Sequence, residues 1–336
     1  MDPISQGAVG AALATSTQDR KKQLFTVAWL GALAGLAPDL DVLIQSNTDP
    51  LLFLEFHRQF SHALVFIPFG ALFVAGPLYP LARKTLSWRQ TYLACLAGYA
   101  THGLLDACTS YGTQLFWPFS DERVAWNNSS IVDPLFTLPI LALVIAAAMQ
   151  GKRLLGIFAM AWALFYLTMG WVQQERAMAI AEHQAKLRGH TPGRLSVRPS
   201  FGNVMLFKSI YENQGVYHVD AVRVGLTSYW CAGTSIERFN KQNSFAELAQ
   251  DSQQARDIER FRWFSDDYLA QDEAGRVIDM RYSMIPDSID AMWGIKVDVT
   301  RPNDHVGWWA SRQVGAEELA HFTDLLLGRG CAEVSK

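Results

Sequence analysis

The chain has 336 residues, half of them hydrophobic, and a formal net charge of -3 at pH 7. A balance this close to neutral argues against nucleic-acid binding, which usually needs a basic face. The length is typical of two domains. The charged side chains are unevenly distributed, since residues 1–175 contain 21 of them and residues 176–336 contain 40. The first half is therefore suited to an apolar surrounding and the second to water.

The first half contains five apolar segments, at residues 24–37, 63–82, 91–105, 131–149 and 154–172. A bilayer core requires about 20 apolar residues in a helix, so the second, fourth and fifth segments are long enough to span a membrane. The first and third are shorter and end in polar residues. We therefore predict a membrane all-α helical bundle with about five apolar segments over residues 1–172. The alternative is a large soluble helical core.

Basic residues gather in alternate loops of this bundle. Eight Lys and Arg residues lie before the first segment, between the second and third, and between the fourth and fifth, whereas the opposite loops contain two. The positive-inside rule then predicts a cytoplasmic N-terminus and an extracytoplasmic C-terminal domain. Arg176, Lys186 and Arg188, just after the last segment, favour the opposite orientation.

Residues 173–336 have the composition of a soluble α+β domain. Helical residues run up to a stop signal at Gly189, and two alternating segments flank an expected turn at residues 213–215. Further strands are expected at residues 276–285 and 295–299, and a helix at residues 245–264.

The four cysteines form no CxxC pair, which argues against a zinc knuckle or a redox dithiol. Cys231 and Cys331 both lie in the polar half. They could form a disulfide if that half is extracytoplasmic, because the redox compartment decides whether such a bond persists.

Ionisable residues stand where the apolar segments begin or end. Two end the first segment, two precede the second, two end the third and two lie before or at the start of the fourth: Asp39 and Asp41, His57 and His62, His102 and Asp106, and Asp121 and Asp133. If the chain threads alternately, all eight reach the same side of the membrane. Ionisable groups at membrane depth are costly and usually mark a functional site.

Imidazole and carboxylate together suit Zn, Mn or Fe. We predict that six residues hold a divalent metal, zinc before the others, or orient its ligands: Asp39, Asp41, His57, His62, His102 and Asp106. Six ligands exceed one four-coordinate centre, so two metals, or one metal with supporting carboxylates, are both open. A metal here would lower the pKa of a bound water, which is hydrolytic chemistry. We further expect Arg58 to bind an anionic group, and Asp121 or Asp133 to act as a base or a supporting partner.

Each of these elements also has a simpler interpretation. The PDLD sequence at residues 38–41 could end a helix, and His102 with Asp106 could be a hydrogen-bonded pair. Arg58 could anchor the membrane interface, and Asp133 before a proline could cap the fourth helix. The conjunction of three His and three Asp on one side favours the metal interpretation.

Four sequence blocks, in this order, carry a resemblance to a known family: PDLDVL, HRQFSHALVF, YATHGLLDACTSYGTQLFWPFSDERVAW and IVDPL. Over about residues 1–150 the chain resembles the bacterial inner-membrane, metal-dependent hydrolase family typified by YdjM. The resemblance implies a multi-pass protein of the inner membrane whose polar positions coincide with the six residues above. Members often begin with a Thr-His pair, where this chain has Ser5 and Gln6.

The leading hypothesis is a membrane-embedded metal-dependent hydrolase that cleaves a phosphoester or other ester of a lipid-like substrate at the membrane interface. The alternative is a non-enzymatic membrane scaffold or transporter with a structural metal site and a partner-binding tail. A transporter should carry ionisable groups deep in the fourth and fifth segments. Residues 134–149 and 154–172 contain no charged residue, which favours a site on one side of the membrane.

Overall fold

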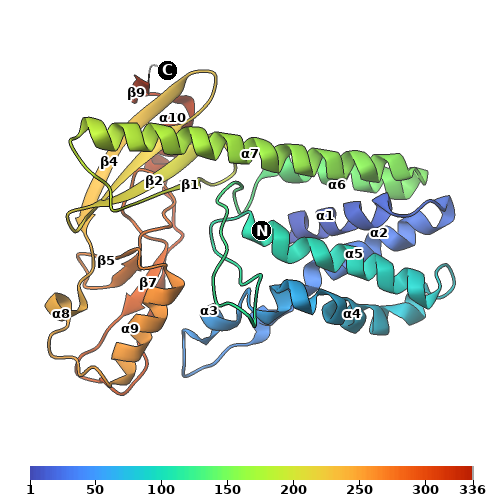
Figure 1. The fold of residues 1–336 in the computed structure, drawn as a ribbon, viewed down its shortest axis with the longest axis horizontal. Coiled ribbons are helices and arrows are strands. Elements are labelled where there is room, and N and C mark those ends of the chain that lie inside the picture. The colour runs from blue at the N-terminus through green and yellow to red at the C-terminus, as the bar shows by residue number, and fades with distance from the viewer. Residues whose placement is uncertain (335–336) are drawn as a thin grey trace. The chain divides into compact units, whose positions relative to one another are not determined.

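The computed structural model describes residues 1–334, which form two compact units (Figure 1). Of the described residues, the first unit comprises 1–44, 56–172 and 201–203, and the second comprises 45–55, 173–200 and 204–334. The first is helical and the second is rich in sheet, which confirms the predicted change of architecture along the chain. Residues 45–55 lie in the sequence between two parts of the first unit, but they belong to the second unit.

The helices and 3-10 turns of the N-terminal half are α1 Pro3–Ser16, η1 Lys21–Gln23, α2 Leu24–Leu36, η2 Ala37–Leu43, α3 Leu52–Phe56, η3 Phe60–His62, η4 Leu64–Phe66, α4 Ile67–Ala82, α5 Trp88–Ala107, α6 Pro134–Gln150 and α7 Arg153–Leu187. Helix α1 packs against α2, α5 and α6, while α2 and α4 pack against α5. The sequence did not predict α1. It places Met1 beside Asp106, at the far end of α5 from the basic loops.

Three helical stretches are long and apolar enough to cross a membrane: Lys21–Leu43, Leu64–Ala82 and Arg153–Leu187. The apolar helix α6 is shorter. The predicted count of five spans is thus not reached on length and composition alone. The outward side chains of these helices are apolar, as lipid contact requires, and include Phe73 at 72% and Leu81 at 72% exposure.

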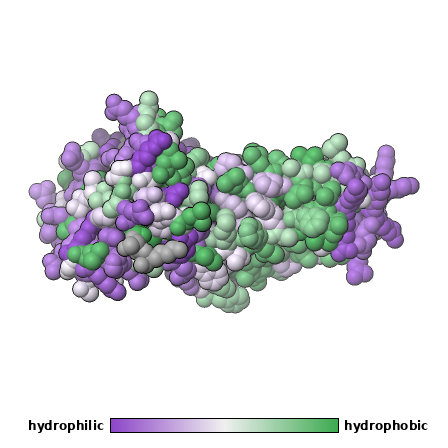
Figure 2. All heavy atoms as spheres, turned by 90° about the horizontal axis from the view of Figure 1, so that it is seen from above, coloured by the Kyte–Doolittle hydropathy of each residue, from purple (hydrophilic) through white to green (hydrophobic). Residues whose placement is uncertain are grey.

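Eight basic side chains form one end of the helical unit: Arg20, Lys21, Lys22, Arg83, Lys84, Arg89, Lys152 and Arg153. Contacts between the loops hold this end together, since Arg153 donates to the Ser16 carbonyl and pairs with Asp19, and Gln23 donates to the Thr85 carbonyl. Figure 2 shows the green hydrophobic surface of the helices giving way to a purple cap at their end. We call these eight residues the basic end.

The second unit contains two antiparallel sheets. The strands are β1 Arg194–Pro199, β2 Leu206–Asn213, β3 Val216–Arg223, β4 Ser228–Glu237, β5 Leu269–Gln271, β6 Val277–Asp279, β7 Trp293–Lys296, β8 Gly307–Ala310 and β9 Ala332–Val334. One sheet has the order β1-β2-β3-β4-β9 and the other β5-β6-β7-β8. Ile210 and Tyr217 of the first share a buried core with Tyr268 and Ile278 beside or on the second. The unit also contains α8 Lys241–Ser244, α9 Gln253–Phe264 and α10 Ala316–Leu327.

The turn between β2 and β3 confirms the predicted hairpin. Asn213 pairs with Val216, and both Gln214 and Gly215 have positive φ, as a two-residue hairpin turn needs. The predicted helix at residues 245–264 was wrong in its first turns. Helix α9 begins only after Ser252, whose hydroxyl accepts a hydrogen bond from the Ala255 amide and so fixes the start of the helix.

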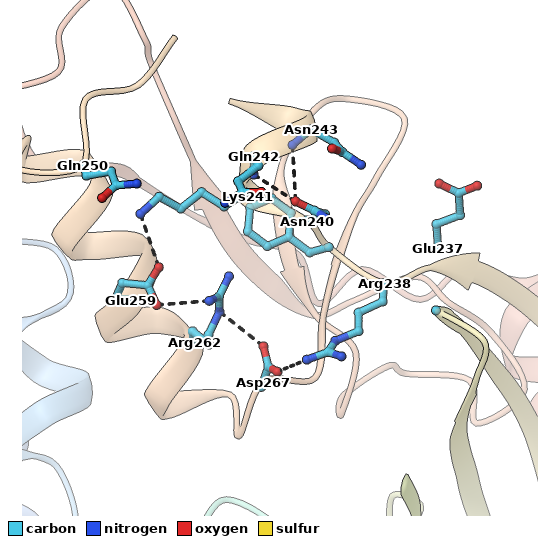
Figure 3. Close-up of a pocket in the computed structure, with 12 residues that line it drawn as sticks. Glu237, Arg238, Asn240, Lys241, Gln242, Asn243, Gln250, Glu259, Arg262 and Asp267 are labelled. Atoms are coloured by element: carbon cyan, nitrogen blue, oxygen red, sulfur yellow. Dashed lines mark hydrogen bonds and ion pairs between the residues drawn. The ribbon is translucent and has the colours of Figure 1, made fainter. Parts of the chain in front are cut away.

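A polar pocket of about 750 Å³ lies beside α8 and α9 (Figure 3). Three cations line it, and each is paired with a carboxylate. Arg262 lies 3.2 Å from Glu259 and 3.3 Å from Asp267, Lys241 lies 3.4 Å from Glu259, and Arg238 pairs with Asp267. The pocket therefore presents no surplus of positive charge.

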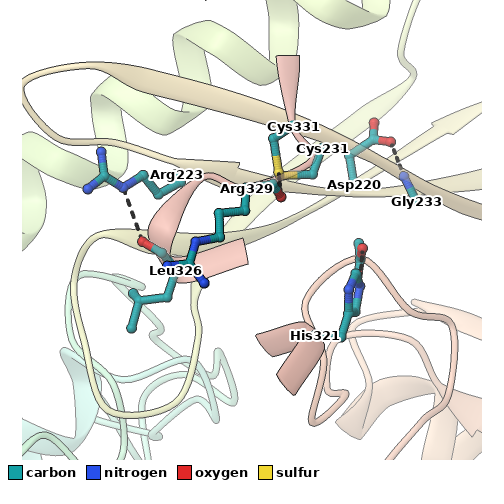
Figure 4. The surroundings of a disulfide bond; sticks show 9 residues. Asp220, Arg223, Cys231, Gly233, His321, Leu326, Arg329 and Cys331 are labelled. Carbon is teal, nitrogen blue, oxygen red and sulfur yellow. Dashed lines mark hydrogen bonds and ion pairs between the residues drawn. A yellow bond between two sulfur atoms is a disulfide. The ribbon is translucent and has the colours of Figure 1, made fainter. Parts of the chain in front are cut away.

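Cys231 on β4 and Cys331 before β9 are joined by a disulfide, which closes a loop with a sequence separation of 100 (Figure 4). Crosslinking so long a loop restricts the unfolded chain and stabilises a domain by about 4 kcal/mol. We expect Cys331→Ser to lower the free energy of unfolding of this unit by about that amount, measured by urea denaturation in detergent. Adding reductant to the unaltered protein should produce the same loss, and equal stability of variant and parent would contradict the prediction.

Lys208 on β2 is buried and donates to Ser283 Oγ and to the Ser288 carbonyl, both at 2.7 Å. Burial lowers the pKa of Lys208 to about 7, although the negative charges of Asp279, Asp287 and Asp290 act to raise it. A lysine whose pKa is lower in the folded than in the unfolded state binds fewer protons when folded. Stability therefore rises with pH between about 7 and the unfolded value of 10.5.

We expect the urea midpoint of the second unit to rise between pH 7 and pH 10 in the unaltered protein. Lys208→Met should remove this rise, because it removes the titrating group. Lys296→Met, which alters an exposed lysine, should retain it. A rise that survives in Lys208→Met would show that another group titrates.

Candidate metal centre

Four side chains from three segments meet at the end of the helical unit opposite the basic end: Asp39 on η2, His62 on η3, and His102 and Asp106 on α5. Asp39 Oδ1 lies 3.5 Å from Nε2 of His62 and 3.3 Å from Nε2 of His102. Asp106 Oδ2 lies 3.3 and 3.7 Å from the same two nitrogens. The two nitrogens are 2.9 Å apart. We call these four residues the inner group.

These separations match those of ligands around one metal ion. Zinc bonds of about 2.0–2.1 Å to His and carboxylate in a tetrahedron place neighbouring donor atoms about 3.3 Å apart. The five measured separations lie between 2.9 and 3.7 Å. The two carboxylates carry two negative charges, which one divalent cation balances, and the two neutral imidazoles add none. The donor set therefore fits a divalent ion.

Both histidines are held with Nε2 available for a metal. His102 Nδ1 lies 2.5 Å from the Gly35 carbonyl, which can only accept, so Nδ1 carries the hydrogen. His62 Nδ1 lies 3.2 Å from Asp41 Oδ2 and 3.0 Å from Ser61 Oγ. Such partners on the far nitrogen fix the tautomer and the ring orientation of metal-binding histidines.

Small residues allow the three segments to approach closely. A Cβ at Gly98 would lie 2.2 Å from the Gly31 carbonyl oxygen, so α5 and α2 touch through their backbones. This contact brings the end of α2, with the Gly35 carbonyl, against His102. A Cβ at Gly103 would lie 2.2 Å from the His62 carbonyl oxygen. Glycine at these positions is therefore part of the construction of the site.

A second group of possible ligands consists of Asp39, Asp41 and His57, and we call it the outer group. His57 Nδ1 lies 2.8 Å from Asp41 Oδ1, and the His57 side chain is 19% exposed. Asp39 belongs to both groups, and its side chain is 27% exposed. A carboxylate shared in this way is the feature that joins the two ions of a two-metal site.

Asp41 also supports the other residues. Its Oδ2 accepts hydrogen bonds from the Arg58 amide at 3.0 Å and from Ser61 Oγ at 2.7 Å, and lies near His62 Nδ1. Its Oδ1 lies near His57 Nδ1, so this carboxylate contacts both His57 and His62. Asp41 therefore orients His57 and His62, whether or not it also binds a metal.

Arg58 is buried beside the inner group. Its Nε lies 2.9 Å from Asp106 Oδ2, and Nη1 donates to Thr109 Oγ1 at 3.0 Å. The guanidinium also stacks 4.7 Å from the centre of the Tyr111 ring. Its backbone has a φ of 66°, an uncommon conformation for a residue other than glycine. This turn directs the side chain toward Asp106.

The carboxylates attract a cation to His62. Burial acts to lower the pKa of His62, but the neighbouring carboxylates of Asp106, Asp39 and Asp41 raise it to about 10. A divalent ion at the same place would replace that proton, because the same carboxylates favour either cation.

Two buried oxygens of the site point to a further occupant. Asp106 Oδ2 accepts no aligned hydrogen bond from residues 1–334, although Arg58 is close to it. Gln6 donates to Asp106 Oδ1 at 2.8 Å, while its Oε1 has no hydrogen-bond partner in the described chain. Buried polar atoms are usually satisfied, so these oxygens are available to a metal or to its ligands.

The model of a protein family described as YdjM inner membrane protein matches residues 1–177, which contain every residue of both groups. This chain belongs to the YdjM inner membrane protein family. The apolar helices agree with the membrane location that this family name gives.

One relative of this YdjM protein is the uncharacterized protein YfhP of Bacillus subtilis (strain 168), which is 30% identical over 117 residues. The match covers 34% of this chain and 34% of that protein. No solved structure matches the chain.

All six residues expected to bind metal in this YdjM protein lie in the two groups. Asp121 and Asp133 lie in neither. Asp121 is exposed in the loop after α5. Asp133 is the N-cap of α6, accepting from the Leu135 and Phe136 amides, and it also accepts from the Tyr166 hydroxyl at 2.7 Å.

Several contacts of the site were not expected from the sequence. They involve the Gly35 carbonyl, Ser61, Thr109 and the Met1 amino group, which pairs with Asp106. A backbone carbonyl and a common hydroxyl leave no pattern in a sequence. Gln6 had a signal, because it stands at one of the positions where the resemblance suggested a polar pair.

Proposed function

We propose that this chain is a metal-dependent hydrolase of the inner membrane that cleaves a phosphoester or other ester of a lipid-like substrate at the membrane interface. The observation that carries the proposal is the convergence of four donor atoms, from Asp39, His62, His102 and Asp106, at separations between 2.9 and 3.7 Å. Zinc is the ion we expect first, with manganese or iron as alternatives.

A divalent ion held by such groups activates water and stabilises negative charge on a substrate oxygen. The residues of the chain would hold and orient this ion. The inner group supplies two imidazole nitrogens and two carboxylate oxygens, and Asp41 holds the rings of His57 and His62 in place. Arg58 fixes Asp106 and adds a positive charge beside the site, which favours an anionic substrate.

The lipid-like substrate is suggested by apolar side chains around the site. Leu43 on η2 is 75% exposed, and Phe119 in the loop after α5 is 85% exposed. Leu40 and Trp126 are exposed nearby in the same segments. Exposed apolar and aromatic residues at the end of a membrane bundle are typical of the interface with lipid headgroups.

We propose that the basic end faces the cytoplasm and that the C-terminal unit is extracytoplasmic. Chain threading supports this, because α7 begins at the basic end and leads away from it. The Cys231–Cys331 disulfide supports it too, since such bonds persist in oxidising compartments. A reporter enzyme that folds only outside the cytoplasm should be active when fused to the C-terminus, and activity of a cytoplasmic reporter there instead would contradict the orientation.

The proposed activity is tested by purifying the protein in detergent and measuring its metal by elemental analysis. Stoichiometric zinc, manganese or iron, with turnover of a member of a phospholipid, lipid-phosphate and ester panel, would support a hydrolase. Bound metal without turnover of any panel member would favour a metal-stabilised scaffold. Folded protein that takes up no metal would refute the metal centre itself.

A further inference from the structure

Residues 45–55 connect the two segments that carry the outer group. Asp41 lies shortly before this stretch and His57 shortly after it, yet the stretch belongs to the second unit. Only residue 56 separates Glu55 from His57 in the sequence, so the two α-carbons are at most about 7 Å apart. Any residue that holds Glu55 in place therefore limits where His57 can lie.

One arginine of the second unit holds this stretch. Arg260 on α9 forms a two-pronged contact with Asp49, at 3.0 and 2.8 Å, and its Nε donates to Glu55 at 2.5 Å. Asp257, one turn earlier on the same helix, accepts a fourth contact at 2.8 Å and has a side chain that is fully buried. We call Arg260, Asp49, Glu55 and Asp257 the Arg260 cluster. Planar two-pronged contacts of this kind fix orientation as well as distance.

The stretch itself is well braced and well packed. Ser46 Oγ accepts from the Thr48 and Asp49 amides, and Asp49 Oδ1 accepts from the Leu51 amide. Leu51 is buried, and Phe53 meets Trp308 edge to face with ring centres 5.3 Å apart. A stretch with a fixed conformation holds its two ends at a fixed separation, whereas a flexible loop would not.

We infer that Arg260 is a positioning residue for the outer group: by holding residues 45–55 it sets the place of His57 relative to Asp39 and Asp41. The effect acts along the chain, because residues 45–55 continue at one end into the segment with Asp41 and at the other into the segment with His57. The inference rests on the proposed function, because it assumes that the outer group binds a metal ion. The inner group has no member next to residues 45–55 and should not depend on Arg260.

The test is a titration of metal-free, detergent-purified protein with zinc, in which the affinities of two binding steps are measured. We expect Arg260→Gln to weaken zinc binding at the outer group by about 10- to 100-fold and to leave binding at the inner group unchanged. A loss of this size is usual when a residue that orients a metal ligand is removed. Arg262→Gln is the matched control. Arg262 lies on the same helix and also pairs with two carboxylates, Glu259 and Asp267, but contacts nothing in residues 45–55 that the structure describes.

A purely structural role of Arg260 would lower thermal stability without separating the two steps. Two unchanged steps in Arg260→Gln would overturn the inference, whereas an unaltered protein that binds no zinc would refute the proposed function instead. If Arg260→Gln does not fold, the double variant Asp49→Asn, Glu55→Gln leaves the Arg260–Asp257 pair intact and should show the same selective loss. Unchanged binding in that folded double variant would also overturn the inference.

Discussion

Replacing His102 by alanine is expected to remove the metal of the inner group. His102 is fully buried, its Nδ1 is committed to the Gly35 carbonyl, and its Nε2 lies within 3.7 Å of a donor atom of each other member. Its loss leaves the inner group with three donors, from Asp39, His62 and Asp106. We expect zinc affinity at this step to fall by more than about 100-fold, beyond the cost of losing a merely supporting partner.

Equilibrium dialysis followed by elemental analysis measures this effect. His183→Ala is the matched control, because His183 is an exposed histidine on α7 outside both groups. Circular dichroism should show that both variants retain their helices. Full metal content in folded His102→Ala would mean that the inner group is a hydrogen-bonded cluster and not a metal centre.

The sequence indicated which residues could meet, on the condition that the chain crosses the membrane at each apolar segment in turn. The end of one segment and the start of the next then lie on the same side of the membrane. This places Asp39, His62 and Asp106 on one side although they are distant in the chain, and in the structure they lie together. No tertiary information was needed for that step.

Three features could not be predicted in this way. Residues 3–16 are apolar but too short to span a membrane, and they form α1, which packs against α2, α5 and α6. Residues 45–55 belong to the second unit, where they contact Arg260 and Trp308, both more than 200 residues later in the chain. Asp133 resembles a site residue in sequence, but its carboxylate caps α6, the simpler alternative that its position before Pro134 allowed.

The separation of roles within the site also depends on geometry. Asp39 and Asp41 are two residues apart on one turn and have the same chemistry. In the structure Asp39 lies within 3.5 Å of the two histidine nitrogens of the inner group, whereas Asp41 accepts hydrogen bonds from the Arg58 amide and the Ser61 hydroxyl. The number of hydrogen bonds that each carboxylate accepts distinguishes a shared ligand from an orienting residue.

Asp39→Asn is expected to have the broadest effect, because Asp39 is the one residue common to both groups within the described chain. Asparagine keeps the size of the side chain but removes the charge that a divalent ion needs. We expect both zinc-binding steps to weaken by more than about 100-fold, again more than the loss of an orienting partner costs. His57→Ala should weaken one step only, and Asp41→Asn should weaken binding by about 10- to 100-fold through the misplaced histidines.

The pattern across these variants decides how many ions the site holds. Asp121→Asn, at an exposed aspartate outside both groups, is the control and should bind as the unaltered protein does. If Asp39→Asn and His57→Ala lose the same single step while the other survives, Asp39 serves the outer group alone and the inner group needs only three ligands. If only one step exists in the unaltered protein and His57→Ala retains it, the site holds one ion. In that case Asp41 and His57 orient the ligands of this ion through the hydrogen bond between them, and they bind no second ion.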